Sequence, residues 1–206
     1  EALTEVILGL PPATPGVVIV QHMPAGFTKS FADQLNEAAA MQVQEAKDGD
    51  RVIPGHVLIA PGGFQLTVVR SGGVYRVKVQ PGEKRCGHCP SVETMMESVA
   101  KCAGANAVGA ILTGMGADGA GGLKAMKDAG AKTLAQDEAT SLVFGMPKQA
   151  IAQGGVDKVK PLPEIAKGNP VPHPPFWGSR VVTDVPLKNI FGYINEIALF
   201  NGQWGF

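Results

Sequence analysis

The sequence is poor in the features that mark several large classes of protein. No apolar run in its 206 residues approaches the ~20 that a membrane-spanning helix needs. The three cysteines are an odd number, which argues against a disulfide framework and fits a reducing cytoplasm. Charge is scarce and balanced, with 18 Lys+Arg against 18 Asp+Glu. We therefore expect a cytoplasmic protein that neither binds nucleic acid nor inserts into a membrane.

The sequence also lacks an initiator methionine and a signal peptide. It begins at Glu1 inside an apparent helix, EALTEVILGL, which indicates a fragment of a longer protein. Apolar residues make up 45% of the chain and charged residues 17%, so the chain can bury a core. The length suffices for one α/β domain and a smaller additional piece.

A metal site is not expected. Cys86, His88 and Cys89 supply three possible zinc ligands within four residues. The second ligand pair of a structural zinc site is missing apart from Cys102, which falls on a predicted helix. We interpret the segment around Cys86 as a loop with incidental thiols.

Short apolar runs alternate with amphipathic runs along the chain. Strands are expected at 16–21, 56–60, 107–112 and 133–136, and helices at 1–10, 28–40, 91–103, 121–129 and 141–154. Segments 65–70 and 74–80 flank a Ser-Gly-Gly turn, which predicts a β-hairpin. The alternation predicts an α/β fold: a doubly wound, mostly parallel sheet in three α/β/α layers, with the hairpin as an insertion.

A glycine-rich loop follows the predicted strand at 107–112. Gly114, Gly116 and Gly119 have the G-x-G-x-x-G spacing of a dinucleotide-binding loop. Asp118 lies inside this loop, where its carboxylate would repel a phosphate ~4 Å away by roughly 1 kcal/mol in water and ~4 kcal/mol at an effective dielectric of 20. A nucleotide-binding domain therefore stays only an alternative. The same geometry suits an oxyanion, and an aspartate there can fix the tautomer of a histidine.

His22 is the candidate for that histidine. It lies just beyond the predicted strand at 16–21, as Asp118 lies just beyond the strand at 107–112. Ligands of parallel sheets bind at the carboxyl ends of strands, so both residues are expected at one edge. A lone histidine at a strand end is usually structural. Two converging candidates place a dyad, in which Asp118 contacts Nδ1 of His22, on an equal footing with that interpretation.

Several long motifs resemble one known family. They are QHMPAGFTKSFADQLN, LIAPGG, PSVETMMESVAKCAG, AILTGMGADGAGGLKAMKDAGAKTLAQDEATSLVFGMPKQAI and AQGGV. Together they resemble the catalytic domain of the chemotaxis response-regulator protein-glutamate methylesterase, over residues 1–165. The resemblance implies a Rossmann-like serine hydrolase without a cofactor, which hydrolyses glutamate methyl esters and deamidates glutamines on the cytoplasmic domains of chemoreceptors. By motif, His22 and Asp118 are the histidine and aspartate of a Ser-His-Asp triad, and the backbone N–H of Met115 falls at the oxyanion position.

The chain departs from the family pattern in two respects. The family's nucleophile lies in a G-A-S-T-G-G turn immediately before the helix that here begins at Glu1. We therefore expect the serine, its preceding strand and the receiver domain to be missing, and the chain to be inactive. The family's Arg before PSV and His after APGG correspond to Cys89 and Gln65, which puts substrate contacts in question.

No other hydroxyl is expected to replace the missing serine. Thr28, Ser30 and Ser91 are interpreted as helix-start residues, with Thr28 and Ser91 as N-caps. Ser179 lies in the C-terminal tail. A non-catalytic remnant that binds a partner through its exposed sheet edge and tail is a further alternative.

The C-terminal segment differs in composition from the rest. Residues 161–175 contain six prolines, which predicts a linker, assigned to 166–175. Residues 176–206 are then a separate appendage. Residues 173–206 resemble the start of the activation region of cobalamin-dependent methionine synthase, but the cobalamin-binding D-x-H-x-x-G motif is not present.

Overall fold

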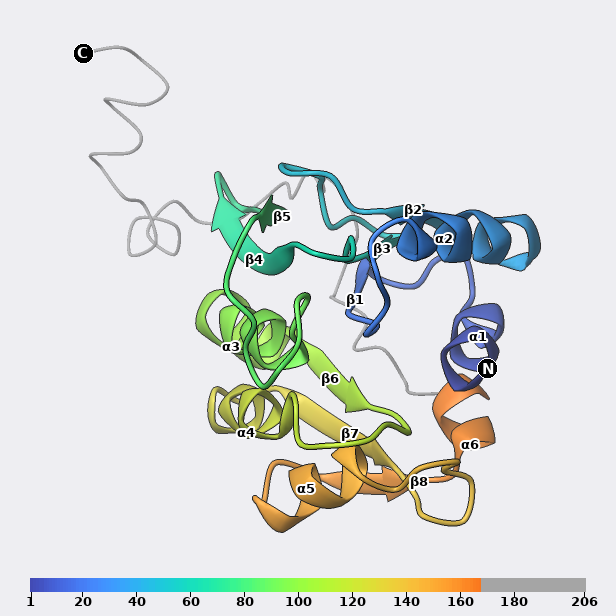
Figure 1. Cartoon of the computed structure of the whole chain (residues 1–206), viewed down its shortest axis with the longest axis vertical. Coiled ribbons are helices and arrows are strands. Elements are labelled where there is room, and N and C mark those ends of the chain that lie inside the picture. The colour runs from blue at the N-terminus through green and yellow to red at the C-terminus, as the bar shows by residue number, and fades with distance from the viewer. Residues whose placement is uncertain (168–206) are drawn as a thin grey trace, which may run out of the picture. The chain divides into compact units, whose positions relative to one another are not determined.

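Short parallel strands arranged in two sheets carry the fold (Figure 1). The computed structural model describes residues 1–167. Its strands are β1 (Val17–Ile19), β2 (Gln42–Glu45), β3 (His56–Ile59), β4 (Gln65–Ser71), β5 (Val74–Gln80), β6 (Val108–Ile111), β7 (Lys132–Gln136) and β8 (Lys158–Lys160). One sheet has the order β1-β3-β2 and the other the order β6-β7-β8, and all neighbours within them are parallel. Strands β4 and β5 form a separate antiparallel hairpin.

Helices alternate with the parallel strands. They are α1 (Ala2–Gly9), α2 (Phe27–Ala38), α3 (Val92–Cys102), α4 (Ala120–Asp128), α5 (Met146–Ala152) and α6 (Leu162–Lys167), with a short 3-10 turn at Gly104–Asn106. This arrangement, with the hairpin inserted between β3 and α3, confirms the predicted α/β fold class.

The sheet β1-β3-β2 is buried on both faces. Val57 and Ile59 of β3 belong to a core cluster that includes Ile7 of α1 and Leu35 of α2. Leu58, between them, belongs to a second cluster shared with the hairpin, α3 and α4. Since successive side chains of a strand point to opposite faces, β3 is covered on both sides. This burial explains why β3 is a continuous apolar run.

Close packing of α3 against α4 fixes the loop that follows β6. A Cβ on Gly122 would lie 2.8 Å from the Cβ of Met96, so only a glycine permits this approach of the two helices. Leu123 of α4 and Ile111 of β6 are almost completely buried in the same core. The loop between β6 and α4 is thereby held at the N-terminal end of α3.

Strands β1 and β6 are edge strands of the two parallel sheets. In residues 1–167, β1 pairs only with β3, aligning Val18 with Leu58. In the same range β6 pairs only with β7, aligning Ala110 with Leu134. An edge strand presents a row of backbone N–H and C=O groups to which a further strand can pair.

Four elements differ from the sequence prediction, one of which is α6, a helix that the sequence analysis does not expect. Strands β2 (QVQE) and β8 (KVK) are not predicted, because each lies at the outer edge of its sheet and has a single apolar residue. The helix predicted at 141–154 begins only at Met146. The residues before it bond to the loop after β6 instead, where the Gly114 N–H donates to the carbonyl of Val143 at 3.0 Å.

Thr28 is not the N-cap of α2, contrary to the prediction. The cap is Gly26, and Thr28 is the second residue of the helix. Its fully buried hydroxyl donates to Glu45 Oε1 at 2.5 Å and accepts from the Gly62 N–H at 3.1 Å. The sequence pattern predicts that the Thr28 hydroxyl caps α2, but in the structure this hydroxyl connects α2 to two segments that are distant in the sequence.

The first part of the proline-rich segment forms a packed helix, α6. Leu162, Ile165 and Ala166 of α6 are buried. Gly9 of α1 lies directly against them, since a Cβ on Gly9 would be 2.5 Å from the carbonyl oxygen of Ala166. Apolar residues one helical turn apart therefore outweigh the nearby prolines. The remainder of the predicted linker at 166–175 and the predicted appendage at 176–206 lie outside the described residues.

We expect Ile165→Ala to lower the free energy of unfolding by ~2–5 kcal/mol, because the substitution removes a buried side chain and leaves a cavity under α6. Glu164→Ala, at the exposed neighbouring position, should change the free energy of unfolding by less than ~0.5 kcal/mol. Urea unfolding of both variants measures the difference. Equal urea midpoints for the two variants would show that the packing of α6 does not stabilise the fold.

Candidate active site

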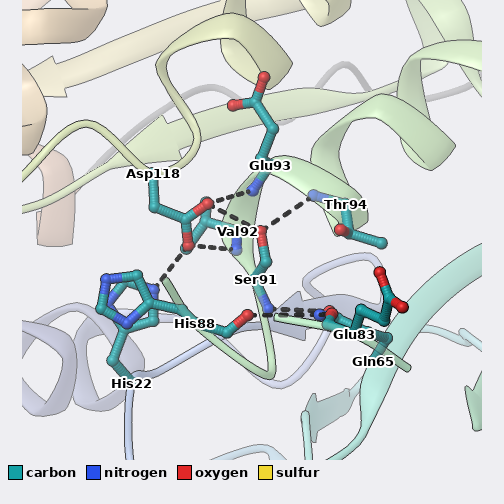
Figure 2. Close-up of polar contacts among 9 residues, drawn as sticks. All are labelled: His22, Gln65, Glu83, His88, Ser91, Val92, Glu93, Thr94 and Asp118. Carbon is teal, nitrogen blue, oxygen red and sulfur yellow. Dashed lines mark hydrogen bonds and ion pairs between the residues drawn. The ribbon is translucent and has the colours of Figure 1, made fainter. Parts of the chain in front are cut away.

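Two strand ends, one from each sheet, bring a histidine and an aspartate together (Figure 2). His22 follows β1, and Asp118 lies in the loop between β6 and α4. His22 Nε2 is 2.7 Å from Asp118 Oδ2. The His22 side chain is 22% exposed, whereas the Asp118 side chain is fully buried. One member of the pair can therefore meet a substrate, and the other is held inside the protein.

The contact uses a different ring nitrogen from the predicted one. Asp118 contacts Nε2 of His22 and not Nδ1, so that part of the prediction is wrong. Nε2 is the nitrogen farther from the backbone, and it reaches a carboxylate carried by the other sheet. With Nε2 donating to Asp118, Nδ1 is the nitrogen left to accept a proton.

The first turn of α3 surrounds the Asp118 carboxylate with donors. Ser91 Oγ donates to Oδ1 at 2.8 Å and the Glu93 N–H donates to the same oxygen at 3.0 Å. The Val92 N–H donates to Oδ2 at 2.8 Å. With His22 these make four hydrogen bonds, which fill the roughly four lone-pair positions of a carboxylate. The N–H groups of a first helical turn have no partner within the helix, and the helix dipole favours an anion there.

These contacts keep Asp118 ionised. Burial alone would raise the pKa of Asp118, but the hydrogen bonds from His22, the Glu93 N–H, Ser91 and the Val92 N–H lower it to about 2. Asp118 is therefore a fixed anion at neutral pH, and it holds the proton on the Nε2 side of the His22 ring.

Ser91 has two roles, of which the sequence pattern predicts one. Its hydroxyl oxygen accepts from the Thr94 N–H at 3.4 Å, which confirms Ser91 as the N-cap of α3. The same hydroxyl donates to Asp118. The helix start PSVE carries the signal for this second role, because the free N–H groups of such a start attract an anion.

A second histidine, interpreted from the sequence only as a possible zinc ligand, lies against the first. The rings of His88 and His22 are stacked, with centroids 3.7 Å apart and an angle of 7° between their planes. Burial and the neighbouring His22 lower the pKa of His88. His88 is therefore an uncharged flat ring on one face of His22.

A tight turn holds His88 in place. Arg85 and His88 exchange two backbone hydrogen bonds of 2.9 Å across Cys86 and Gly87, both of which have positive φ. The Arg85 guanidinium makes bonds of 2.7 and 2.5 Å to Glu97 of α3. Burial raises the pKa of the Cys86 thiol, and the Asp118 charge raises it further, so this thiol is a poor nucleophile.

Gln65 connects the hairpin to the same loop. Its buried amide nitrogen donates to the carbonyls of Glu83 at 2.8 Å and His88 at 3.3 Å, and its oxygen accepts from the Ser91 N–H at 3.0 Å. Gln65, which stands where the family has a histidine, therefore has a structural role: it fixes the segment that leads into α3.

Contacts within the protein account for the glycines of the loop between β6 and α4. A Cβ on Gly119, which has φ 88°, would overlap Val92, and a Cβ on Gly114 would overlap Met146. These glycines let the loop pack on α3 and α5, so the nucleotide-binding alternative has no supporting observation. Met115, the candidate oxyanion residue, lies at the surface of this loop and is 82% exposed.

The described residues contain no cluster of potential metal ligands. Within residues 1–167, no group of three or more His, Cys, Asp or Glu side chains is arranged to hold a metal ion, and Cys86, Cys89 and Cys102 are free thiols. No helix in this part of the chain is long and apolar enough to cross a membrane.

Comparisons with known proteins agree on one family. Residues 1–168 match the family described as CheB methylesterase. A protein-glutamate methylesterase/protein-glutamine glutaminase of Syntrophotalea carbinolica is 58% identical, and a homologue of the same description, numbered 2, from Pseudomonas aeruginosa is 54% identical. Each alignment covers 81% of this chain and 47% or 48% of the relative, so the chain spans about half the length of these relatives. The crystal structure of the Thermotoga maritima CheB methylesterase catalytic domain matches with a TM-score of 0.77 and 38% identity, covering 80% of this chain and 88% of that one.

The buried Asp118 carboxylate makes stability depend on pH. Its pKa is depressed from 3.8 to about 2, so its contribution is complete above about pH 4 and is lost as the pH falls towards 2. We expect Asp118→Asn to lower the free energy of unfolding at pH 7 by ~2 kcal/mol or more, and to remove the corresponding loss between pH 4 and 2. Urea unfolding at several pH values measures both effects. Asp33→Asn, at an exposed site, is the control, and an identical pH dependence in all three proteins would contradict the assignment.

Proposed function

Because the chain belongs to the CheB methylesterase family, we propose that His22 and Asp118 are two members of a Ser-His-Asp triad that hydrolyses glutamate methyl esters on proteins. The same site is proposed to deamidate glutamine side chains, the second activity in the names of the curated relatives. The observation that carries the proposal is the 2.7 Å contact between His22 Nε2 and the buried carboxylate of Asp118. A fixed, ionised carboxylate orients the histidine of such a triad and stabilises its protonated form.

In this mechanism His22 transfers protons through Nδ1. It takes the proton of a serine hydroxyl while the serine oxygen attacks the ester carbonyl, and the Met115 N–H donates to the oxyanion that forms. His22 then gives its proton to the departing methoxide, which leaves as methanol. Water repeats the sequence on the acyl-enzyme and releases a glutamate carboxylate. With a glutamine substrate the leaving group is ammonia, and the steps are otherwise the same.

We place the nucleophilic serine outside this chain, on a strand and turn that precede Glu1. The free edges of β1 and β6 support this placement, because His22 and Asp118 follow these two strands. The hydroxyls considered as replacements are otherwise engaged: Thr28 bonds Glu45, and Ser91 bonds Asp118. Ser30 lies exposed on α2, with its hydroxyl directed to the Gly26 carbonyl.

The proposed substrates are methylated cytoplasmic domains of chemoreceptors, and the proposed regulatory partner is a receiver domain outside this chain. The site is proposed to work in the cytoplasm, in accord with the free cysteines. Residues 166–175 and 176–206 are proposed as a linker and a separate appendage. The catalytic steps above need only groups of the protein and water, so no cofactor is part of the proposal.

The proposal predicts that activity returns when the upstream strand and G-A-S-T-G-G turn are added. The extended chain should release methanol from a methylated receptor fragment, and the present chain should do so at least ~10³-fold more slowly, because a general base without its nucleophile leaves little catalysis. Methanol release, measured with both chains at equal concentration, tests this expectation.

Two variants of the extended chain complete the test. His22→Gln should lower kcat by at least ~10³-fold, whereas Ser30→Ala should leave it unchanged. Release by the present chain at the rate of the extended one would contradict the upstream placement of the serine. Full activity of His22→Gln would contradict the triad itself.

A further inference from the structure

The stacked ring of His88 has no part in the mechanism described above. Figure 2 shows the His88 and His22 rings lying one over the other, with Asp118 at the edge of the His22 ring. The centroids are 3.7 Å apart and the planes differ by 7°. His88 thus touches the face of the proposed catalytic ring, while Asp118 touches its edge.

A single hydrogen bond cannot fix the orientation of an imidazole. The bond from His22 Nε2 to Asp118 Oδ2 sets where one nitrogen lies, but the ring can still swing about that bond. Such a swing moves Nδ1, which must point at the hydroxyl it deprotonates. A contact with the ring face removes this freedom, because a parallel neighbour at van der Waals distance permits only one plane.

We propose that His88 is a positioning residue, whose ring fixes the plane of the His22 imidazole and hence the direction of Nδ1. The catalytic meaning of this role rests on the proposed function. The positioning itself is a property of the chain as it stands and can be measured without any activity.

The support for His88 comes from its own loop and does not depend on His22. Arg85 and His88 are paired across their two-residue turn, and the Gln65 amide donates to the His88 carbonyl. The Arg85–Glu97 ion pair anchors the turn to α3. The same helix holds Asp118 through its first turn, so α3 supports both groups that contact the His22 ring.

The charges around His88 suit this role. The groups that act on its ring are His22, Asp118 and Lys84, and the Cys86 thiol lies near Asp118. Burial and the neighbouring His22 lower the pKa of His88, which favours the uncharged form of its ring. Two imidazolium rings 3.7 Å apart would repel each other, whereas a neutral ring can lie against a protonated one.

NMR relaxation of the His22 ring C–H groups, in the present chain labelled with ¹³C- and ¹⁵N-histidine, tests the positioning. The His22 signals are assigned from their loss in His22→Gln. We expect the Nε2–H tautomer of His22 to persist in all His88 variants, because Asp118 fixes it. The His22 ring should have high order parameters in the unchanged chain and in His88→Phe, which keeps a flat ring. His88→Ala and His88→Leu should lower these order parameters. His88→Leu fills the space without a flat ring, so it gives the comparison even if His88→Ala does not fold.

Two results would overturn the inference. One is a His22 ring whose order parameters stay as high in the leucine variant as in the unchanged chain, and the other is a phenylalanine variant in which they fall as far as in the leucine variant. Thermal melts of each variant separate these results from a loss of folding. His56→Leu, on β3, is the matched control and should leave the His22 signals unchanged.

Kinetics of the extended chain then connect positioning to catalysis. His88→Leu should lower kcat by ~10- to 100-fold with KM changed less than ~2-fold, and His88→Phe should recover most of that loss, since misplacement of a catalytic group by ~1 Å costs up to ~10²-fold. An active extended chain whose kcat does not respond to His88→Leu would contradict the catalytic role. An extended chain that is inactive with a well-ordered His22 would instead count against the proposed function.

Discussion

The ionised carboxylate of Asp118, buried at the N-terminus of α3, is the constraint on which the site depends. An unpaired buried charge is strongly unfavourable, so every donor around Asp118 must stay in place for the fold to be stable. Those donors belong to separate parts of the chain: His22 follows β1, and Ser91, Val92 and Glu93 begin α3. One side chain therefore ties the end of the first sheet, the loop after β6 and the start of α3 together.

Much of the surrounding sequence serves this junction. Gly119 and Gly122 allow α4 to approach α3 closely enough for Asp118 to reach the first helical turn. Gln65 holds the segment that leads into the same turn from the hairpin. His22 keeps part of its side chain exposed, and its ring is bonded on one edge by Asp118 and covered on one face by His88. The rigid components thus lie inside the protein and leave only Nδ1 of His22 to act outward.

The sequence allows prediction of what local pattern and topology decide. The carboxyl ends of parallel strands lie at the same edge of a sheet, so the positions of His22 and Asp118 make their proximity one possibility. The motif resemblance is what assigns both residues to one site. The choice of Nε2 depends on the distance between two sheets, which no local pattern encodes. The Thr28 hydroxyl donates to Glu45 and does not cap the helix. The position of the His88 ring depends on a turn in which Cys86 has a positive φ, a backbone conformation that residues other than glycine rarely adopt. In both cases a contact between distant segments overrides the local preference.

The central claim is that a serine from an upstream strand completes the pair formed by His22 and Asp118. The most direct measurement is a high-resolution crystal structure of the chain extended by that strand and its turn. The account predicts a strand between β1 and β6, with the serine Oγ within ~3 Å of His22 Nδ1 and Asp118 still bonded to Nε2. A serine more than ~6 Å from His22, with neither side chain able to rotate into contact, would contradict it.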